Sequence, residues 1–337
     1  MSSLSNLLLP AVLFFVLGIL TKVIKSDLRF PPDMAKMLSI YLLMSIGLHG
    51  GYVLAKADLV IALNSVLWAL VMGFVIPIVG YLILLVTKRV GLLDAAAISA
   101  HYGSVSAGTF LTAIAYLDNA GLEYEQYPVI MLAVMETPAI IVGLILAAKA
   151  RQTIAAREGS TRVISEEDAE DDKSNMRHLL HDAFTNGSVV VLLGSMLIGA
   201  IALPSGMEKL EPFTEEIFMG VLCLFLFEMG SVAGQRLGDL KQVGAVLALF
   251  GIVMPVIGGC IGVLVGSYLL DFGVGGTTLV AILAASASYI AVPPAMRLAV
   301  PEANPSFYLT LSLGITFPFN VIVGIPLFQS IAEKLVA

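Results

Sequence analysis

The sequence is poor in cysteine and in charge, and these shortages exclude several classes of protein. Cys223 and Cys260 both lie in apolar stretches, so neither a disulfide framework nor a cysteine metal site is expected. Charged residues make up 13% of the chain, against about 25% in an average soluble domain, and no basic stripe suited to nucleic acid occurs. There is also no nucleotide-binding loop, metalloprotease motif or nucleophile–base pattern, so neither an enzyme nor a bound cofactor is expected.

Apolar residues are abundant instead. They make up 58% of the chain, and the mean hydropathy is +0.95. The net charge of −7 owes much to one acidic run, residues 166–172, which interrupts the apolar segments. The composition therefore predicts a protein that lies in a lipid bilayer.

Segmentation at about 20 apolar residues per membrane helix gives ten spans. They begin near residues 7, 34, 59, 93, 127, 183, 213, 242, 273 and 305. The first is interpreted as a span and not a signal peptide, because no basic region precedes it and apolar segments follow throughout. A polar segment at 149–182 divides the spans into five and five.

The two halves share a pattern at nearly constant spacing. Glu136-Thr137-Pro138 corresponds to Thr316-Phe317-Pro318, and Pro77 to Pro255. Two further matches join Val142-Gly143 to Val323-Gly324, and Gly47 with Ala57-Asp58-Leu59 to Gly230 with Gly238-Asp239-Leu240, all at offsets of 178 to 183. We therefore predict an all-α polytopic membrane protein built from a first five-helix repeat at 1–148, an acidic linker at 149–182 and a second five-helix repeat at 183–337.

A unit of five spans crosses the membrane an odd number of times, so its second copy must be inverted. Inverted repeats are typical of secondary transporters, whose sites lie at the repeat interface near the bilayer midplane. The ten-span arrangement puts 15 of the 18 basic residues on one side, leaving Lys56, Lys209 and Lys334 on the other. The positive-inside rule then predicts a cytoplasmic linker and both termini outside. The membrane is expected to be the plasma membrane.

The fourth and ninth segments differ from the rest because small and hydroxylated residues replace large apolar ones. Residues 101–109 include Gly103, Ser104, Ser106 and Thr109. Residues 286–294 include Ser286, Ser288 and Tyr289 and end in two prolines, which remove backbone donors and break a helix. Both segments are predicted to be broken helices at equivalent positions in the two halves.

A helix that begins inside the membrane has free N–H groups and about half a positive charge at its N-terminus. Two such ends with serine hydroxyls can hold a small oxyanion, and freed carbonyls can bind sodium. Small residues in membrane helices also serve close packing alone. Their occurrence at matched places in both halves favours a transport site.

Two carboxylates lie within predicted spans, where each costs on the order of 2.5–3.5 kcal/mol on insertion scales. Glu136 precedes Thr137-Pro138, which loosens the helix, and it is the stronger candidate for binding a cation or carrying a proton. Glu228 has a coupling role, lies near a membrane edge, or pairs with a polar neighbour.

Several motifs are familiar. They are Gly47-Leu48-His49-Gly50-Gly51, the broken segment Gly103 to Thr109, Pro293-Pro294-Ala295-Met296-Arg297, Pro301-Glu302-Ala303-Asn304-Pro305-Ser306 and Gly324-Ile325-Pro326-Leu327-Phe328. With these motifs the chain resembles the cyanobacterial sodium-dependent bicarbonate transporter family over nearly its whole length.

The resemblance implies a core domain and a gate domain, a site between the broken helices and sodium-coupled uptake. It also implies an oligomer, expected to be a homotrimer, and a cytoplasmic PII-like regulator. Two positions depart from the family pattern, since Tyr289 and Glu136 stand where that pattern has aspartates. The change at Tyr289 removes a negative charge and adds bulk, which affects the expected ion and anion sites.

The sequence thus predicts a sodium-coupled symporter of bicarbonate or another small monoanion. Gly103, Ser104, Ser106, Ser286, Ser288 and Tyr289 are the candidate anion-site residues. Thr109 and Glu136 are the candidate cation-site residues, and no metal other than sodium is expected. The alternatives are a sodium/proton antiporter that uses Glu136 and Glu228, and a membrane sensor or receptor without flux.

Overall fold

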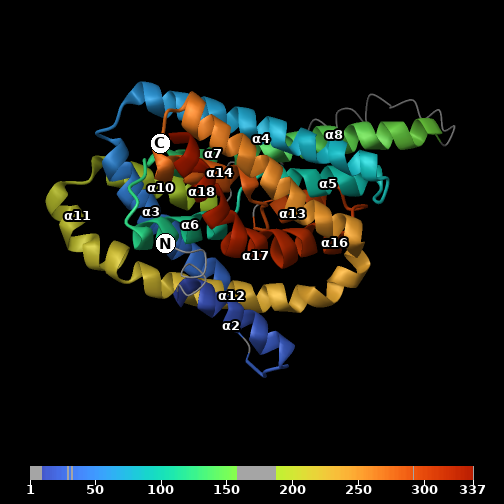
Figure 1. Ribbon diagram of the computed structural model, residues 1–337, viewed down its shortest axis with the longest axis horizontal. Helices are drawn as coiled ribbons and strands as arrows, with labels where there is room; N and C mark the ends of the chain where they lie inside the picture. The colour runs from blue at the N-terminus through green and yellow to red at the C-terminus, as the bar shows by residue number, and fades with distance from the viewer. Residues whose placement is uncertain (1–9, 29, 32, 158–186, 291, 337) are drawn as a thin grey trace.

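The computed structural model describes residues 10–28, 30–31, 33–157, 187–290 and 292–336, and these residues form helices without any strand. Figure 1 shows their arrangement. The first half comprises α2 (Pro10–Val23), α3 (Met34–Leu54), α4 (Leu59–Thr87), α5 (Leu92–Gly103), α6 (Ala107–Ala120), α7 (Tyr127–Val134) and α8 (Glu136–Arg157). The second half comprises α10 (Gly187–Ile201), α11 (Pro204–Glu211), the π-helical turn η1 (Pro212–Glu216), α12 (Phe218–Arg236), the short 3₁₀ turn η2 (Leu237–Asp239), α13 (Leu240–Leu264), η3 (Val265–Leu269), α14 (Val274–Ala285), α15 (Val292–Ala299), α16 (Pro305–Leu309), η4 (Thr310–Thr316), α17 (Phe317–Phe319), η5 (Asn320–Gly324) and α18 (Ile325–Val336).

Six helical stretches in the described part of the chain are long and apolar enough to cross a membrane. They are Met34–Leu54, Leu59–Thr87, Tyr127–Arg157, Pro204–Asp239, Gln242–Leu269 and Pro305–Val336. Shorter apolar helices lie at Pro10–Val23, Val189–Ile201 and Val274–Ala285. The chain is therefore a helical membrane protein. The count of ten spans stays a prediction, because these lengths give six long stretches and three shorter helices among the described residues.

Some predicted boundaries agree with the helices and one does not. The starts expected near residues 34, 59, 127 and 305 coincide with Met34, Leu59, Tyr127 and Pro305. Helical structure before α12 begins at Pro204, nine residues before the predicted start at 213, because the polar helix α11 precedes the apolar stretch. The predicted starts at 7 and 183, and the acidic run at 166–172, lie outside the described residues.

The helices form two packed groups. In the first, which we call the four-helix group, α2 packs along α12, α10 packs along α3, and α3 also contacts α12. In the second, the broken-helix group, α5 packs between α4 and α8, and α14 packs against α13 and α18. Helix α6 contacts both groups, since it touches α14 and also α3 and α12.

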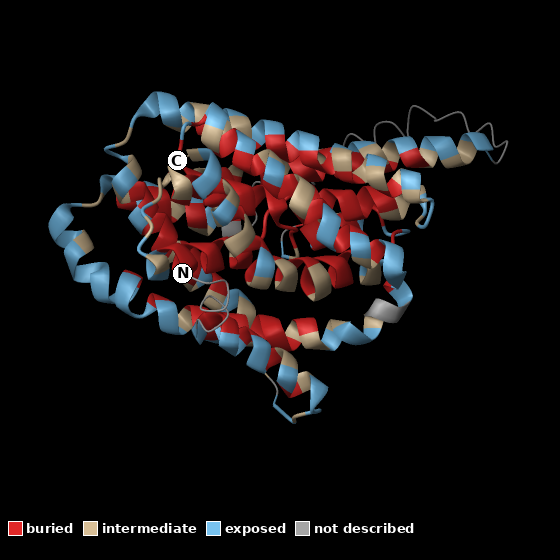
Figure 2. Ribbon diagram, viewed as in Figure 1, coloured by how far each residue is buried: buried red, intermediate tan, exposed pale blue. Residues whose placement is uncertain are grey.

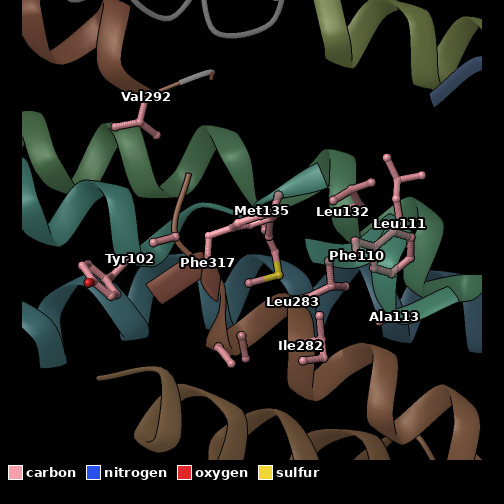
Figure 3. Packing of buried hydrophobic residues seen from close by; sticks show 14 of the residues in the cluster. Tyr102, Phe110, Leu111, Ala113, Leu132, Met135, Ile282, Leu283, Val292 and Phe317 are labelled. Carbon is pink, nitrogen blue, oxygen red and sulfur yellow. The ribbon is translucent and has the colours of Figure 1, made fainter. Parts of the chain in front are cut away.

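Buried residues from both halves form one hydrophobic cluster in the middle of the molecule. Figure 3 shows Phe110 and Met135 of the first half close to Ile282, Leu283 and Phe317 of the second. Large apolar side chains also cover outward faces, which Figure 2 shows as exposed along α4. Leu59 and Val86 are 71% and 82% exposed. An apolar outer surface of this kind needs lipid around it.

The α3–α10 pair packs closely at glycines. A Cβ at Gly51 would overlap the carbonyl oxygen of Met196, and one at Gly47 would lie 2.8 Å from the carbonyl oxygen of Leu192. Helices that pack in a membrane depend on small residues because backbones must approach for van der Waals contact.

Replacing Gly51 by alanine is therefore expected to lower the free energy of unfolding by about 1–3 kcal/mol, because the added methyl group overpacks this contact. Gly194 is the matched control on α10, since a Cβ there meets nothing within 4 Å. Thermal unfolding of the purified variants checks this, and equal melting temperatures for the two would contradict it.

An ion pair joins the end of α8 to the segment that follows α15. Arg151 donates two hydrogen bonds of 2.9 Å to the carboxylate of Glu302 and a third of 2.8 Å to the carbonyl oxygen of Ala299. The side-chain hydrogen bond from Arg151 holds the pKa of Glu302 below its usual range. The pair thus connects the first half of the chain to the second broken segment.

Because the pKa of Glu302 is lower in the folded protein, its stabilising effect is complete above the unfolded pKa and disappears as the pH falls through the folded pKa. We expect wild type to exceed Glu302→Gln in stability by less than about 1 kcal/mol at neutral pH, since both side chains are partly exposed. The difference should vanish at acid pH. Melting temperatures of both proteins from pH 7 to pH 3 measure it, and a difference that grows on acidification would contradict it.

Candidate functional site

The first predicted break is present between α5 and α6. The backbone leaves helical geometry at Ser104, which is extended with φ −94° and ψ 169°. Ser106 then caps α6, and its Oγ accepts a hydrogen bond of 3.2 Å from the Thr109 amide. Serine is suited to this position because its hydroxyl satisfies one of the free donors of the first turn.

The second break has the same form. α14 has twelve residues, as α5 has, and ends at Ser286 with φ −86° and ψ 167°. α15 begins at Val292, whose amide donates a weak hydrogen bond of 3.5 Å to Ser288 Oγ. Pro293 and Pro294 occupy the next two positions and have no N–H. The free backbone N–H groups at this crossing therefore come mainly from the N-terminus of α6. The N-terminus of α15 offers fewer of them.

The two breaks meet, and hydrogen bonds join them. The Ser106 amide donates to Ser286 Oγ at 3.0 Å, and the Ser288 amide donates to the His101 carbonyl oxygen at 2.8 Å. Ser286 Oγ in turn donates to the carbonyl oxygen of Leu283 at 2.9 Å. Segments about 180 residues apart in sequence thus form one polar crossing, which is buried among the hydrophobic residues of both halves.

A small cavity of about 10 Å³ lies beside this crossing. Four of the predicted site residues line it: Ser106, Glu136, Ser288 and Tyr289. A second cavity of similar size also touches Glu136 and is lined by Leu43 of α3 and Leu192 of α10. Glu136 therefore lies where the crossing faces the four-helix group.

Glu136 occupies this place because the fifth predicted span is itself interrupted. α7 ends at Val134, and α8 begins at Glu136. Pro138 lacks the N–H that would continue the hydrogen-bond ladder from α7. The carboxylate consequently stands in the first turn of a new helix, and its side chain reaches the cavity.

Polar atoms near the crossing have unused hydrogen-bonding capacity. Among the described residues, Ser104 Oγ, Glu136 Oε2 and Tyr289 Oη are buried without a hydrogen-bond partner. Buried polar atoms are usually paired, and a group of exceptions calls for a specific explanation. These atoms can serve a polar or charged ligand.

Tyr289 lies at the crossing, next to the first turn of α6 and close to Phe225 of α12. Its phenol oxygen lies beside the Ser106 hydroxyl and the Gly108 amide without a well-aligned hydrogen bond. A Cβ at Gly108 would overlap this oxygen and would lie 2.8 Å from the ring of Phe225 on α12. The Tyr289 ring also packs edge-on against Phe317, with centroids 5.6 Å apart. Tyr289 therefore contacts the first turn of α6.

The remaining predicted residues lie around the cavity but do not line it. The hydroxyl of Thr109 donates to Ser106 Oγ at 2.9 Å, so Thr109 supports the cap of α6. Ser104 ends α5. Gly103 packs against Pro77, whose ring atoms would lie 2.5–2.8 Å from a Cβ at that position. Its contact is with α4 and not with the cavity.

Three polar residues near the crossing were not predicted as site residues. Tyr102 and Thr316 share a hydrogen bond of 2.7 Å, and Thr316 donates to the carbonyl oxygen of Gly251 at 2.7 Å. Asn320 Nδ2 donates to the carbonyl oxygen of Ala285 at 2.8 Å and so satisfies the last turn of α14. A buried asparagine in an apolar stretch was a usable signal, whereas the partners of Tyr102 and Thr316 are evident only from the fold.

Glu228 lies apart from the crossing. It is buried on α12, and its carboxylate lies at the backbone amide of Ala35, in the first turn of α3. A carboxylate at a helix N-terminus is stabilised by the free donors and by the helix dipole. The Ala35 amide thus gives Glu228 a polar neighbour, while its Oε2 has no hydrogen-bond partner among the described residues.

The chain has helices that are long and apolar enough to span a bilayer. It also has two broken helices, α5–α6 and α14–α15, that meet at a buried polar crossing. These features define a polytopic membrane protein with a candidate transport site. A family model described as the Na⁺-dependent bicarbonate transporter superfamily matches residues 10–333. The chain belongs to that superfamily, which makes it a transporter and not an enzyme. A search of curated proteins finds no match.

Proposed function

We propose that the protein is a sodium-coupled symporter of bicarbonate or another small monoanion, with its site at the crossing of the two broken helices. The observation that carries the proposal is the cavity lined by Ser106, Glu136, Ser288 and Tyr289. It brings hydroxyl groups, a carboxylate and a helix N-terminus together in the buried centre of a member of a sodium-dependent bicarbonate transporter family.

The proposed architecture is a pair of inverted five-helix repeats with ten spans. The pairings of α2 with α12 and of α10 with α3 support it, because exchange of the halves converts one pair into the other. Two hydrogen-bonded residue pairs also occupy exchanged positions, although the second half provides the backbone donor in both. The Asn304 amide donates to Asp94 at 2.8 Å, and the Gly273 amide donates to Glu125 at 2.8 Å. Asp94 and Gly273 differ by 179 positions, as do Glu125 and Asn304.

The anion would be held by donors at the crossing. The first turn of α6 provides backbone N–H groups and the positive end of a helix dipole. Hydroxyl groups of Ser104, Ser106 and Ser288 add further donors, Ser286 would hold the Ser106 backbone in place, and Tyr289 would border the anion. This arrangement favours a small oxyanion without a lysine or arginine side chain.

The coupling cation would be held by Glu136, with Thr109 and backbone carbonyls freed at the breaks. Sodium prefers such oxygen ligands. Coupling to sodium is also energetically sensible, because an inside-negative potential opposes a lone anion by about 2.3 kcal/mol per charge per 100 mV. Co-bound cations reverse that sign.

Access to the site requires movement. A cavity of about 10 Å³ has room for about one water molecule, which is less than bicarbonate needs. We propose that the broken-helix group moves against the four-helix group, which separates Tyr289 from Phe225 and opens the crossing to one side of the membrane at a time. In the membrane, both termini would lie outside and the 149–182 linker in the cytoplasm. The proposed assembly is a homotrimer with a PII-like regulator.

A sodium/proton antiporter is the second candidate. The position of Glu136 favours it, because a buried carboxylate can carry a proton. Glu228, which was its proposed partner, lies at α3 and not at the crossing. A sensor or receptor without flux is a third possibility, and it predicts ligand binding without transport.

The direct test is uptake of labelled bicarbonate into proteoliposomes that contain the purified protein, with and without an inward sodium gradient. We expect uptake only with the gradient. Sodium-driven proton movement that needs no anion would support the antiporter, and saturable bicarbonate binding without uptake would support the sensor.

A further inference from the structure

A polar cavity lies away from the crossing. It has a volume of about 300 Å³ and lies between α3, the end of α6, the loop that follows α6, and the η1–α12 junction. Figure 1 shows these helix ends at one side of the molecule, near α11. A volume of this size is at the lower end of the range for small-molecule sites.

Four titratable groups face the cavity: His49, Asp118, Tyr124 and Glu215. His49 Nδ1 lies 3.4 Å from Glu215 Oε1, and the Tyr124 hydroxyl donates to Asp118 Oδ1 at 3.0 Å. Burial and the neighbouring Asp118 charge raise the pKa of Tyr124, so its phenol stays neutral. Two carboxylates therefore face a cavity whose described lining residues include no lysine or arginine.

A separate feature also indicates a ligand. Ser45 lines the cavity, is only 2% exposed, and its Oγ has no hydrogen-bond partner among the described residues. Ile46, Ile114 and Phe218 provide apolar walls. The described residues contain no group of three or more histidine, cysteine or carboxylate side chains that could hold a metal ion. The chemistry thus suits an organic cation with a flat or short apolar body better than a bare ion.

We propose that this cavity binds a small amphipathic organic cation, an amidinium or ammonium compound whose charged end lies between Asp118 and Glu215. Its apolar body would contact Phe218, and its remaining donors would reach Ser45.

The cavity lies between two parts of the molecule, so a ligand bound in it would affect their relative movement. His49 and Glu215 belong to the four-helix group and its η1 extension, whereas Asp118 and Tyr124 belong to α6 and the loop that follows it. Helix α6, the second part of the first broken helix, packs mainly against α14 and would move with the broken-helix group, so a bound cation would link the two groups. Because the proposed transport cycle moves the broken-helix group against the four-helix group, the bound cation would also inhibit transport, and this consequence rests on the proposed function.

The test is equilibrium binding of benzamidine to the purified full-length protein, with benzamide as the neutral isostere, measured by calorimetry. We expect saturable benzamidine binding that weakens about tenfold in Asp118→Asn and in Glu215→Gln, since each change removes a charge-assisted hydrogen bond. Glu333→Gln, a change of an exposed carboxylate outside the cavity, should leave binding unchanged. Equal binding of benzamide, or equal benzamidine binding by all the variants, would overturn the proposal.

A second measurement separates this site from the proposed function. Benzamidine outside proteoliposomes should reduce sodium-driven bicarbonate uptake by wild type and have less effect on Asp118→Asn. If binding follows the expected pattern but no bicarbonate uptake occurs, the cavity site stands and the symporter proposal fails. If uptake occurs and benzamidine binds none of the proteins, the cavity proposal fails alone.

Discussion

Replacing Glu136 by glutamine is expected to reduce sodium-dependent bicarbonate uptake about tenfold or more while the protein remains folded. The two side chains have nearly the same shape, but glutamine lacks the negative charge that would bind the coupling cation in the cavity beside Ser106 and Ser288. Loss of one charged contact is worth at least about 1.4 kcal/mol, which is a factor of ten. The measurement is uptake by proteoliposomes as a function of sodium concentration.

Glu228→Gln is the matched control for this prediction. Glu228 is also a buried carboxylate in a predicted span, but it lies at the Ala35 amide of α3. Glutamine can still accept a hydrogen bond there, so the sodium dependence of uptake should match wild type. If Glu228→Gln removed transport and Glu136→Gln did not, the assignment of the cation site would be wrong. Loss of anion-independent proton exchange in both variants would favour the antiporter.

Replacing Ser286 by valine is expected to disrupt the crossing itself. The Ser106 amide would lose its acceptor, and two methyl groups would enter a position that is 1% exposed. A buried N–H without a partner costs about 1–3 kcal/mol. We therefore expect lower thermal stability together with an uptake rate reduced about tenfold or more, both measured on purified protein in the same lipid.

Ser99→Ala is the control for Ser286→Val. Ser99 is fully buried on α5, and its hydroxyl donates only to the Ala95 carbonyl within the same helix. Its loss should leave uptake close to the wild-type rate. Wild-type uptake by Ser286→Val would show that the Ser106–Ser286 hydrogen bond does not belong to the transport site.

The breaks were predictable because their causes are local. Glycine, serine and proline change backbone preferences within a few residues, so the ends of α5 and α14 could be found from residues 101–109 and 286–294. The helix interruption at Glu136 was also predictable from a local feature, namely Pro138 two residues later.

The neighbours of these residues could not be predicted in the same way. The Tyr102–Thr316 hydrogen bond joins positions 214 residues apart, and nothing in either local sequence specifies the other. The position of Glu228 at the start of α3 is of the same kind. The polar helix α11 was missed for a different reason, since a search for apolar stretches does not register a short helix whose described residues are all unburied.

The distribution of donors at the crossing also differs from the simplest expectation. Two broken helices suggested two equivalent N-termini, but Pro293 and Pro294 remove donors from the first turn of α15. The crossing is consequently asymmetric, with α6 providing most of the free N–H groups. Prolines that break a helix also determine which side of the crossing can bind an anion through its backbone.

The central claim is that sodium and the anion bind together at the crossing. The most direct test is equilibrium binding of labelled bicarbonate to purified protein at several sodium concentrations, with the reverse titration of sodium at several bicarbonate concentrations. We predict that each ligand increases the affinity of the other by the same factor, as linkage requires, and that Glu136→Gln and Ser286→Val both lose this coupling. Bicarbonate binding that is independent of sodium in wild type, or coupling that persists unchanged in both variants, would contradict the account.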